Sequence, residues 1–136
     1  QDLSDIPFSL SAADIALVTL GIEAEGLVAP SKVYGHLAAG SPIAAITPPN
    51  SYLHHLVETE GCGCWFPNGG SSELAAWISH LKDSPNELSR YGAAARALLE
   101  KSATPTLVFE SYRKLIERHL PQCKSLAPTH LNRNPK

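Results

Sequence analysis

A loop and the helix start that follows it, between Glu25 and Lys32, hold the residues of this chain best placed for chemistry. Glu25 and Gly26 close a loop directly after the apolar run 15–20, and Pro30 then begins a helix. In open α/β sheets, anionic ligands bind where a strand's carboxyl end leads through a loop into a helix. The helix N-terminus offers unpaired N–H groups and a partial positive charge of about +0.5. The spacing therefore indicates a binding site for an anionic ligand.

The elements that would position this loop are short buried strands alternating with helices. Continuous apolar runs predict strands over 15–20, 42–46 and 62–66. Proline, serine and glycine signals predict helices over 7–13, 30–39, 51–60, 71–82, 84–101 and 105–120. This order predicts an α/β fold, a Rossmann-like parallel sheet with flanking helices. Because three strands make half of a doubly wound domain, we expect the other half to lie upstream of this sequence.

Two of the predicted helices have specific start signals. Ser71 follows a glycine-rich turn and is a good N-cap residue. The segment 84–87 reads Ser-Pro-Asn-Glu, the pattern of a capping box with proline at the first helical position. We therefore expect the hydroxyls of Ser71 and Ser84 to accept hydrogen bonds from the first turns of their helices.

Composition limits the classes of function. The 136 residues are 43% hydrophobic and 18% charged, as in one globular domain. A net charge of −2 gives no basic surface for nucleic acid, and no apolar run approaches the roughly 18–20 residues of a membrane span. The chain shows no secretion signal and has few cysteines, which predicts a cytoplasmic location. It lacks methionine and begins with Gln1, so we expect a fragment of a longer protein.

No metal or cofactor site is predicted. Cys62 and Cys64 flank Gly63, and such a pair can form half of a metal site. No second cysteine pair or spaced histidine pair completes it, so we interpret both as small apolar residues of a buried strand. His36 shares a helix with Lys32 but has no carboxylate at matching spacing, so we interpret it as a packing or surface residue.

Five short motifs, in this order and spacing, carry a resemblance to a known family. They are ADIALV at 13–18, EG at 25–26, PSKVY at 30–34, AAGSP at 38–42 and GCG at 61–63. Over about residues 2–120, the chain resembles the C-terminal domain of retaining nucleotide-sugar glycosyltransferases of the GT-B fold, family 4. The resemblance implies a partial Rossmann-like domain over 1–120. Residues 121–136 are rich in proline, asparagine, lysine and histidine, which predicts a flexible tail.

The resemblance also implies a function, the binding of a nucleotide-sugar donor such as a UDP- or GDP-sugar. In this family, the loop before the P-S-K helix wraps the sugar and the diphosphate. Its acidic residue, here Glu25, contacts sugar hydroxyls, and the amides at the helix start hold the diphosphate. Gly26 lets the backbone approach the ligand without a Cβ clash. The implied substrate-binding residues are Glu25, Gly26, Leu27, Val28, Pro30, Ser31 and Lys32.

The sequence departs from the family at one position. Many members carry a second glutamate on this helix, which binds the nucleotide ribose, and the matching residue here is Gly35. The family's basic catalytic side chains and most of its acceptor site lie upstream of this segment. The resemblance therefore implies no catalytic residue here, and a fragment that does not transfer sugar alone. The resemblance implies that the fragment works with the N-terminal domain of the same enzyme as its partner. It leaves open which acceptor receives the sugar and whether that domain associates with a membrane.

Two other functions stay open on the sequence. A nucleotide-sugar 2-epimerase of the same fold also binds a nucleotide diphosphate between two domains, although its catalytic acids and histidine have no match here. A non-catalytic Rossmann-type binding module is kept open by Gly35. Epimerisation of the donor without acceptor would identify the first, and a protein partner without nucleotide affinity the second.

Overall fold

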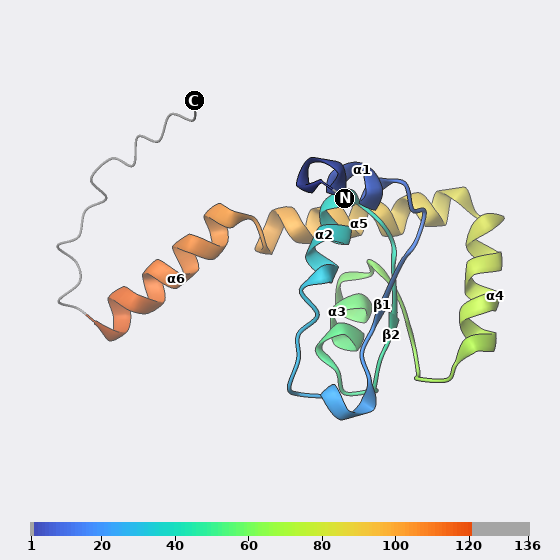
Figure 1. The fold of residues 1–136 in the computed structure, drawn as a ribbon, viewed down its shortest axis with the longest axis horizontal. Coiled ribbons are helices and arrows are strands. Elements are labelled where there is room, and N and C mark those ends of the chain that lie inside the picture. Colours follow the sequence, from blue (N-terminus) through green and yellow to red (C-terminus); the bar gives the residue numbers. More distant parts are fainter. Residues whose placement is uncertain (1, 121–136) are drawn as a thin grey trace. The chain divides into compact units, whose positions relative to one another are not determined.

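The computed structural model describes residues 2–120 (Figure 1). The chain divides between Ala103 and Thr104 into two units. The first unit contains all the strands and, in chain order, the helices α1 (Ile6–Ser11), α2 (Lys32–Ala39), α3 (Tyr52–Glu60), α4 (Ser71–Lys82) and α5 (Pro85–Ser102). Short 3₁₀ turns cover Leu3–Asp5 and Ile22–Ala24. The second unit contains α6 (Pro105–His119).

The strands β1 (Ala16–Thr19), β2 (Ile43–Ile46) and β3 (Gly63–Phe66) form a parallel sheet in the order β1-β2-β3. In the register, Ala16 lies opposite Ile43, which lies opposite Gly63. Each strand lies within an apolar run predicted from the sequence. The predicted fold class, an α/β protein with a Rossmann-like parallel sheet and flanking helices, is therefore confirmed.

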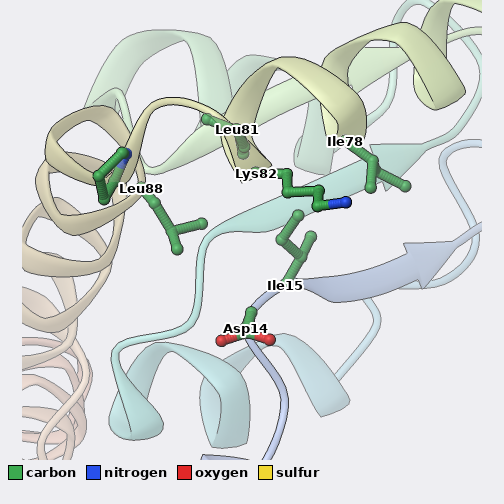
Figure 2. A pocket seen from close by; sticks show the side chains of 7 residues that line it. Asp14, Ile15, Ile78, Leu81, Lys82 and Leu88 are labelled. Carbon is green, nitrogen blue, oxygen red and sulfur yellow. The ribbon is translucent and has the colours of Figure 1, made fainter.

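One face of the sheet is covered by α4 toward β3 and left open toward β1. On the covered side, the Phe66 ring lies 5.5 Å from the Trp77 ring of α4. On the open side, Leu17 in the middle of β1 is 56% exposed, although its neighbour Ala44 on β2 is fully buried. A hollow of about 400 Å³ separates Asp14 and Ile15, just before β1, from α4 and α5, with Ile15 pointing toward α4 (Figure 2).

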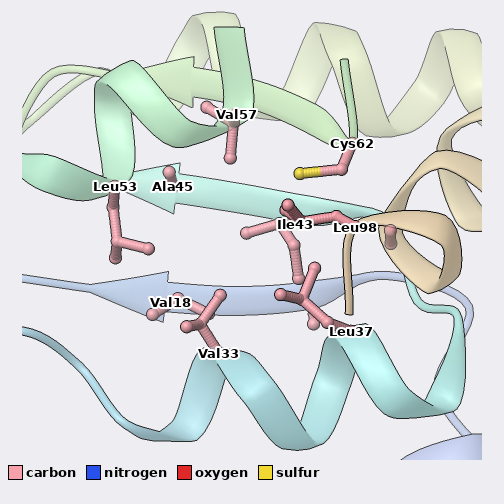
Figure 3. Packing of buried hydrophobic residues seen from close by; sticks show 11 residues of the cluster. Val18, Val33, Leu37, Ile43, Ala45, Leu53, Val57, Cys62 and Leu98 are labelled. Atoms are coloured by element: carbon pink, nitrogen blue, oxygen red, sulfur yellow. The ribbon is translucent and has the colours of Figure 1, made fainter. Parts of the chain in front are cut away.

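The other face of the sheet packs against α2, α3 and α5 and forms the core (Figure 3). Alternate strand residues point to this face, as the two-residue period of a strand requires. The buried cluster joins residues from the sheet with Val33 and Leu37 of α2, Leu53 and Val57 of α3, and Ala95 and Leu98 of α5. These contacts hold the N-terminal ends of α2 and α3 in fixed positions beside the sheet.

Cys62 lies in this cluster with 0% exposure, whereas Cys64 is half-buried. Within residues 2–120, no group of three or more histidine, cysteine or acidic residues is placed to hold a metal ion. Cys62 thus occupies a core position, as interpreted from the sequence, but it lies just before β3, and the interpretation of Cys64 as a buried residue is wrong.

Burial raises the pKa of the Cys62 thiol from 9.0 to about 11. We expect iodoacetamide at pH 8 to modify Cys62 about 100-fold more slowly in the folded chain than in the unfolded chain, because only the thiolate reacts. A Cys64→Ser, Cys123→Ser variant followed by mass spectrometry measures this rate. Equal iodoacetamide rates in the folded and the unfolded chain would contradict the burial.

The same pKa shift predicts a pH dependence of stability. Because the Cys62 thiol ionises at lower pH in the unfolded chain, its contribution to the unfolding free energy should be complete below pH 9 and lost between pH 9 and 11.

The ends of the helices test the start and stop signals predicted from the sequence. Ser51 caps α3, with its side chain accepting a hydrogen bond from the His54 amide at 3.2 Å. Gly40 ends α2 with a φ of 71°, the left-handed conformation that glycine favours at this position. Ser84 is the N-cap of α5 and Pro85 begins the helix, as predicted, but the predicted capping bond is wrong, because the Ser84 side chain makes no cap bond and Glu87 instead contacts His80 at 2.7 Å. The prediction for Ser71 is also wrong, because Gly70 is the N-cap of α4.

The second unit, α6, is described by itself. Thr104 caps it by accepting a hydrogen bond from the Leu107 amide at 3.4 Å. Val108, Tyr112 and Leu115 recur with a helical period and mark an apolar side. The boundary of the domain at residue 120 stays a prediction, and the tail predicted over 121–136 lies outside the described residues. None of the helices within residues 2–120 is both long and apolar enough to cross a membrane.

Candidate functional site

The carboxyl ends of the three strands lead into loops on one edge of the sheet, over residues 20–31, 47–51 and 67–70. Contacts tie these loops together although they are far apart in the sequence. The Asn68 side-chain Nδ2 donates to the Leu20 carbonyl at 3.0 Å. The Glu25 Oε1 accepts from the Asn50 amide at 3.2 Å, which holds the carboxylate beside the start of α3. The predicted acid is therefore fixed at the edge where open α/β sheets bind ligands.

A hollow of about 370 Å³ lies between β1 and the start of α2. Four of the predicted site residues line it, namely Val28, Pro30, Ser31 and Lys32. The helix begins at Lys32 rather than at Pro30, because the turn before it is closed by shorter-range bonds: the Val33 amide donates to the Pro30 carbonyl and the Tyr34 amide to the Ser31 carbonyl. Within residues 2–120, the amides of Ser31 and Lys32 donate to no other group. These amides and the Lys32 ammonium make this end of the hollow suitable for an anion.

The other three predicted residues lie in the loop but do not line this hollow. Glu25 is half-buried, and Gly26 has a φ of 72°, a conformation that other residues rarely adopt. Leu27 is 81% exposed and Val28 is 53% exposed. The loop thus presents an anchored carboxylate between exposed backbone and exposed apolar side chains.

His36 lines the same hollow, which sequence reasoning missed. It follows Lys32 by four residues, so the two side chains lie on one side of α2. Its Nδ1 is buried, with no hydrogen-bond partner within residues 2–120. Burial lowers the pKa of His36 below its ordinary value of 6.5, so the ring is neutral at pH 7. A neutral imidazole can donate to a ligand from one nitrogen and accept from the other.

Gly35, the position that departs from the family pattern, is directed away from this hollow. A Cβ at this residue would lie 3.1 Å from Cδ1 of Leu10 in α1. The Leu10 side chain would have to shift by a few tenths of an ångström, so this contact between α1 and α2 favours a small residue at position 35.

Behind the Glu25 contact lies a buried polar cluster at the end of β2. Thr47 and Ser51 are 0% and 1% exposed, and their hydroxyl oxygens are 2.6 Å apart. The indole Nε1 of Trp65 donates to the Thr47 carbonyl at 3.0 Å. The cluster fixes the turn that carries the Asn50 amide.

A comparison with curated proteins finds similarity to a probable glycosyltransferase, WbjE, from Pseudomonas aeruginosa. The two sequences are 29% identical over 122 residues, which cover 90% of this chain and 30% of the relative. This chain thus spans less than a third of the length of that relative. No family model matches the chain, and no solved structure matches it. Together with the parallel α/β sheet, the similarity supports a fragment of a glycosyltransferase.

Proposed function

We propose that this chain is the donor-binding part of a retaining glycosyltransferase of the GT-B fold, which takes its sugar from a nucleotide-sugar. The observation that carries the proposal is the carboxyl edge of the sheet, where Glu25 and the start of α2 lie on one loop. An acidic hydrogen-bond acceptor beside an anion-binding helix end suits a ligand with both hydroxyl and phosphate groups. The similarity to a probable glycosyltransferase supports the same ligand class.

The residues divide into two roles. The amides of Ser31 and Lys32, with the Lys32 ammonium, would hold the diphosphate, where the positive end of α2 stabilises negative charge. The Glu25 carboxylate would accept hydrogen bonds from sugar hydroxyls, and Gly26 would let the backbone approach the ligand. His36 would donate or accept one further bond in the hollow. In this proposal the catalytic groups and the acceptor site belong to other parts of the protein.

The open side of the sheet supports a partner in the rest of the same protein. Leu20 and Ala16 donate their amides to β2, so the N–H and C=O groups of Leu17 and Thr19 point away from β2. Within residues 2–120, no strand pairs with this edge of β1. Parallel sheets are normally covered on both faces, and a free edge is normally paired or protected. We propose that further strands and helices of the full-length protein cover Leu17 and pair with β1.

A ligand titration tests the donor site. We expect UDP- or GDP-sugars to shift the amide NMR signals of residues 24–36 in the protein, with the free nucleotides identifying the base. A Glu25→Gln variant should bind the nucleotide-sugar about 10- to 100-fold more weakly, because a charged hydrogen bond is worth roughly 1.5–3 kcal/mol.

Glu23→Gln is the matched control, since Glu23 is an exposed acid two residues away in the same loop. This control should bind like the natural chain. No shift with any nucleotide-sugar in the full-length protein, or shifts confined to another surface, would rule out a donor site here.

A further inference from the structure

The buried hydroxyl pair at the end of β2 forms a continuous chain of hydrogen bonds into the first turn of α3. The Thr47 hydroxyl donates to the Pro48 carbonyl at 3.2 Å, so the Ser51 hydroxyl donates to Thr47 at 2.6 Å. Ser51 in turn accepts from the His54 amide at 3.2 Å. With this direction, each hydroxyl donates one bond and accepts one, so both buried groups are satisfied.

This chain of bonds determines where the Asn50 amide points. Pro48 and Pro49 carry no N–H group and have restricted φ angles, so Asn50 provides the first amide after Thr47. The Thr47 backbone is held from two sides, by the ladder bond from its amide to Phe66 and by the indole of Trp65. The turn between Thr47 and Ser51 is therefore anchored at both ends, and its amide donates to Glu25.

The Glu25 carboxylate depends on this turn because the backbone hydrogen bonds of its own loop are local and join residues 21–28 to one another. The surrounding residues Ile22 and Leu27 are 70% and 81% exposed, so packing does not fix the loop around the acid. The contact to Asn50 joins residues 25 positions apart and orients one carboxylate oxygen. Within residues 2–120, the second oxygen accepts no hydrogen bond and so is available to a ligand.

We propose that Thr47 and Ser51 are positioning residues that hold Glu25, through the Asn50 amide, in the orientation that binds the sugar of the donor. This inference rests on the proposed function. Thr47 and Ser51 would affect recognition of the sugar and not of the nucleotide, because in the proposed function the diphosphate binds elsewhere, at the start of α2.

The test compares two ligands on the full-length protein. Thr47→Val keeps the size of the side chain and removes its hydroxyl, and Ser51→Ala removes the other. We expect each variant to bind UDP-glucose or GDP-mannose, whichever the natural protein binds, about tenfold more weakly. Affinity for the matching free nucleotide diphosphate should stay within about twofold, and Thr47→Ser should restore sugar binding. An equal loss for both ligands, or no loss for either, would overturn the proposal.

A second measurement needs no ligand. In protein labelled with ¹⁵N-asparagine, Glu25→Gln should move the Asn50 amide signal, because it replaces the charged oxygen that accepts from this amide. Thr47→Val and Ser51→Ala should reduce the movement that Glu25→Gln causes, while the Asn68 signal remains as in the natural protein. If the movement persists unchanged in both variants, the positioning role is wrong even if the donor site is real. If both variants abolish the movement but the natural protein binds no nucleotide-sugar, Thr47 and Ser51 do hold the contact between Asn50 and Glu25. Their assigned role in sugar binding is then refuted.

Discussion

Replacing Gly63 with alanine is expected to unfold the chain or to cost more than about 4 kcal/mol of unfolding free energy. A Cβ at Gly63 would lie 1.8 Å from the carbonyl oxygen of Ile43 and 2.6 Å from its carbonyl carbon. Both atoms belong to the backbone of the central strand, so no rotamer change can relieve the overlap. Domains of this kind are stable by about 5–15 kcal/mol, so this one methyl group would remove much of the total. Urea denaturation followed by circular dichroism measures the loss.

Gly61→Ala provides the graded control for this experiment. Gly61 lies two residues earlier, has a φ of 61°, and a Cβ there would meet no atom within 4 Å. Only the left-handed backbone is then unfavourable, which costs about 1–2 kcal/mol. If Gly63→Ala were no worse than Gly61→Ala, the close approach of β3 to β2 at this residue would be disproved.

Gly63 also shows what a local pattern omits. Within the sequence Cys-Gly-Cys, it reads as a small residue of a strand or as part of half a metal site. The reason for glycine is its contact with the Ile43 backbone, from a strand about twenty residues away in the sequence. Gly35 is similar, because the contact that favours a small residue comes from Leu10 on another helix. Such reasons depend on tertiary packing, which no local sequence signal contains.

The fold was accessible from the sequence because its signals are local. Each strand is a short continuous apolar run, and Gly40 and Gly61 end helices with the left-handed conformation that their position suggests. The start signals were less reliable. At Ser84 the capping pattern competes with an exposed His80 on the preceding helix, which takes the Glu87 carboxylate at 2.7 Å. A tertiary partner can thus replace a capping bond without shifting the helix.

The candidate site was accessible only in part, for the same reason. Pro30 and the strand before it predicted a helix start here, so the sequence named Ser31 and Lys32, which line the hollow, and their binding role stays a prediction. The contacts of Glu25 with Asn50 and of Asn68 with Leu20 join loops that only the sheet brings together. His36 could have been found from its spacing, since it lies one helical turn after Lys32. The burial of its Nδ1 required the structure.

The second large effect is expected for Leu17→Lys. Its cost in unfolding free energy should be small in this chain and large in the full-length protein. Leu17 is 56% exposed in this chain, so Leu17→Lys should change its unfolding free energy by less than about 1 kcal/mol. In the full-length protein, we propose that added strands and helices cover this residue. A lysine buried there without a partner would then cost several kcal/mol, because burial removes the hydration of its charge. Denaturant unfolding of both lengths measures the difference between the two costs.

Leu3→Lys is the control, because Leu3 is 81% exposed and lies outside the sheet. It should be tolerated in both lengths of protein. Amide hydrogen exchange gives an independent readout, since the Leu17 and Thr19 amides point away from β2 and should gain protection only when another strand pairs with β1. Equal tolerance of Leu17→Lys in both proteins, with fast exchange at both amides, would mean that β1 remains a true edge strand. No strand would then extend the sheet beyond β1, and the ligand at its carboxyl edge would have to be bound without a second half-domain beside β1.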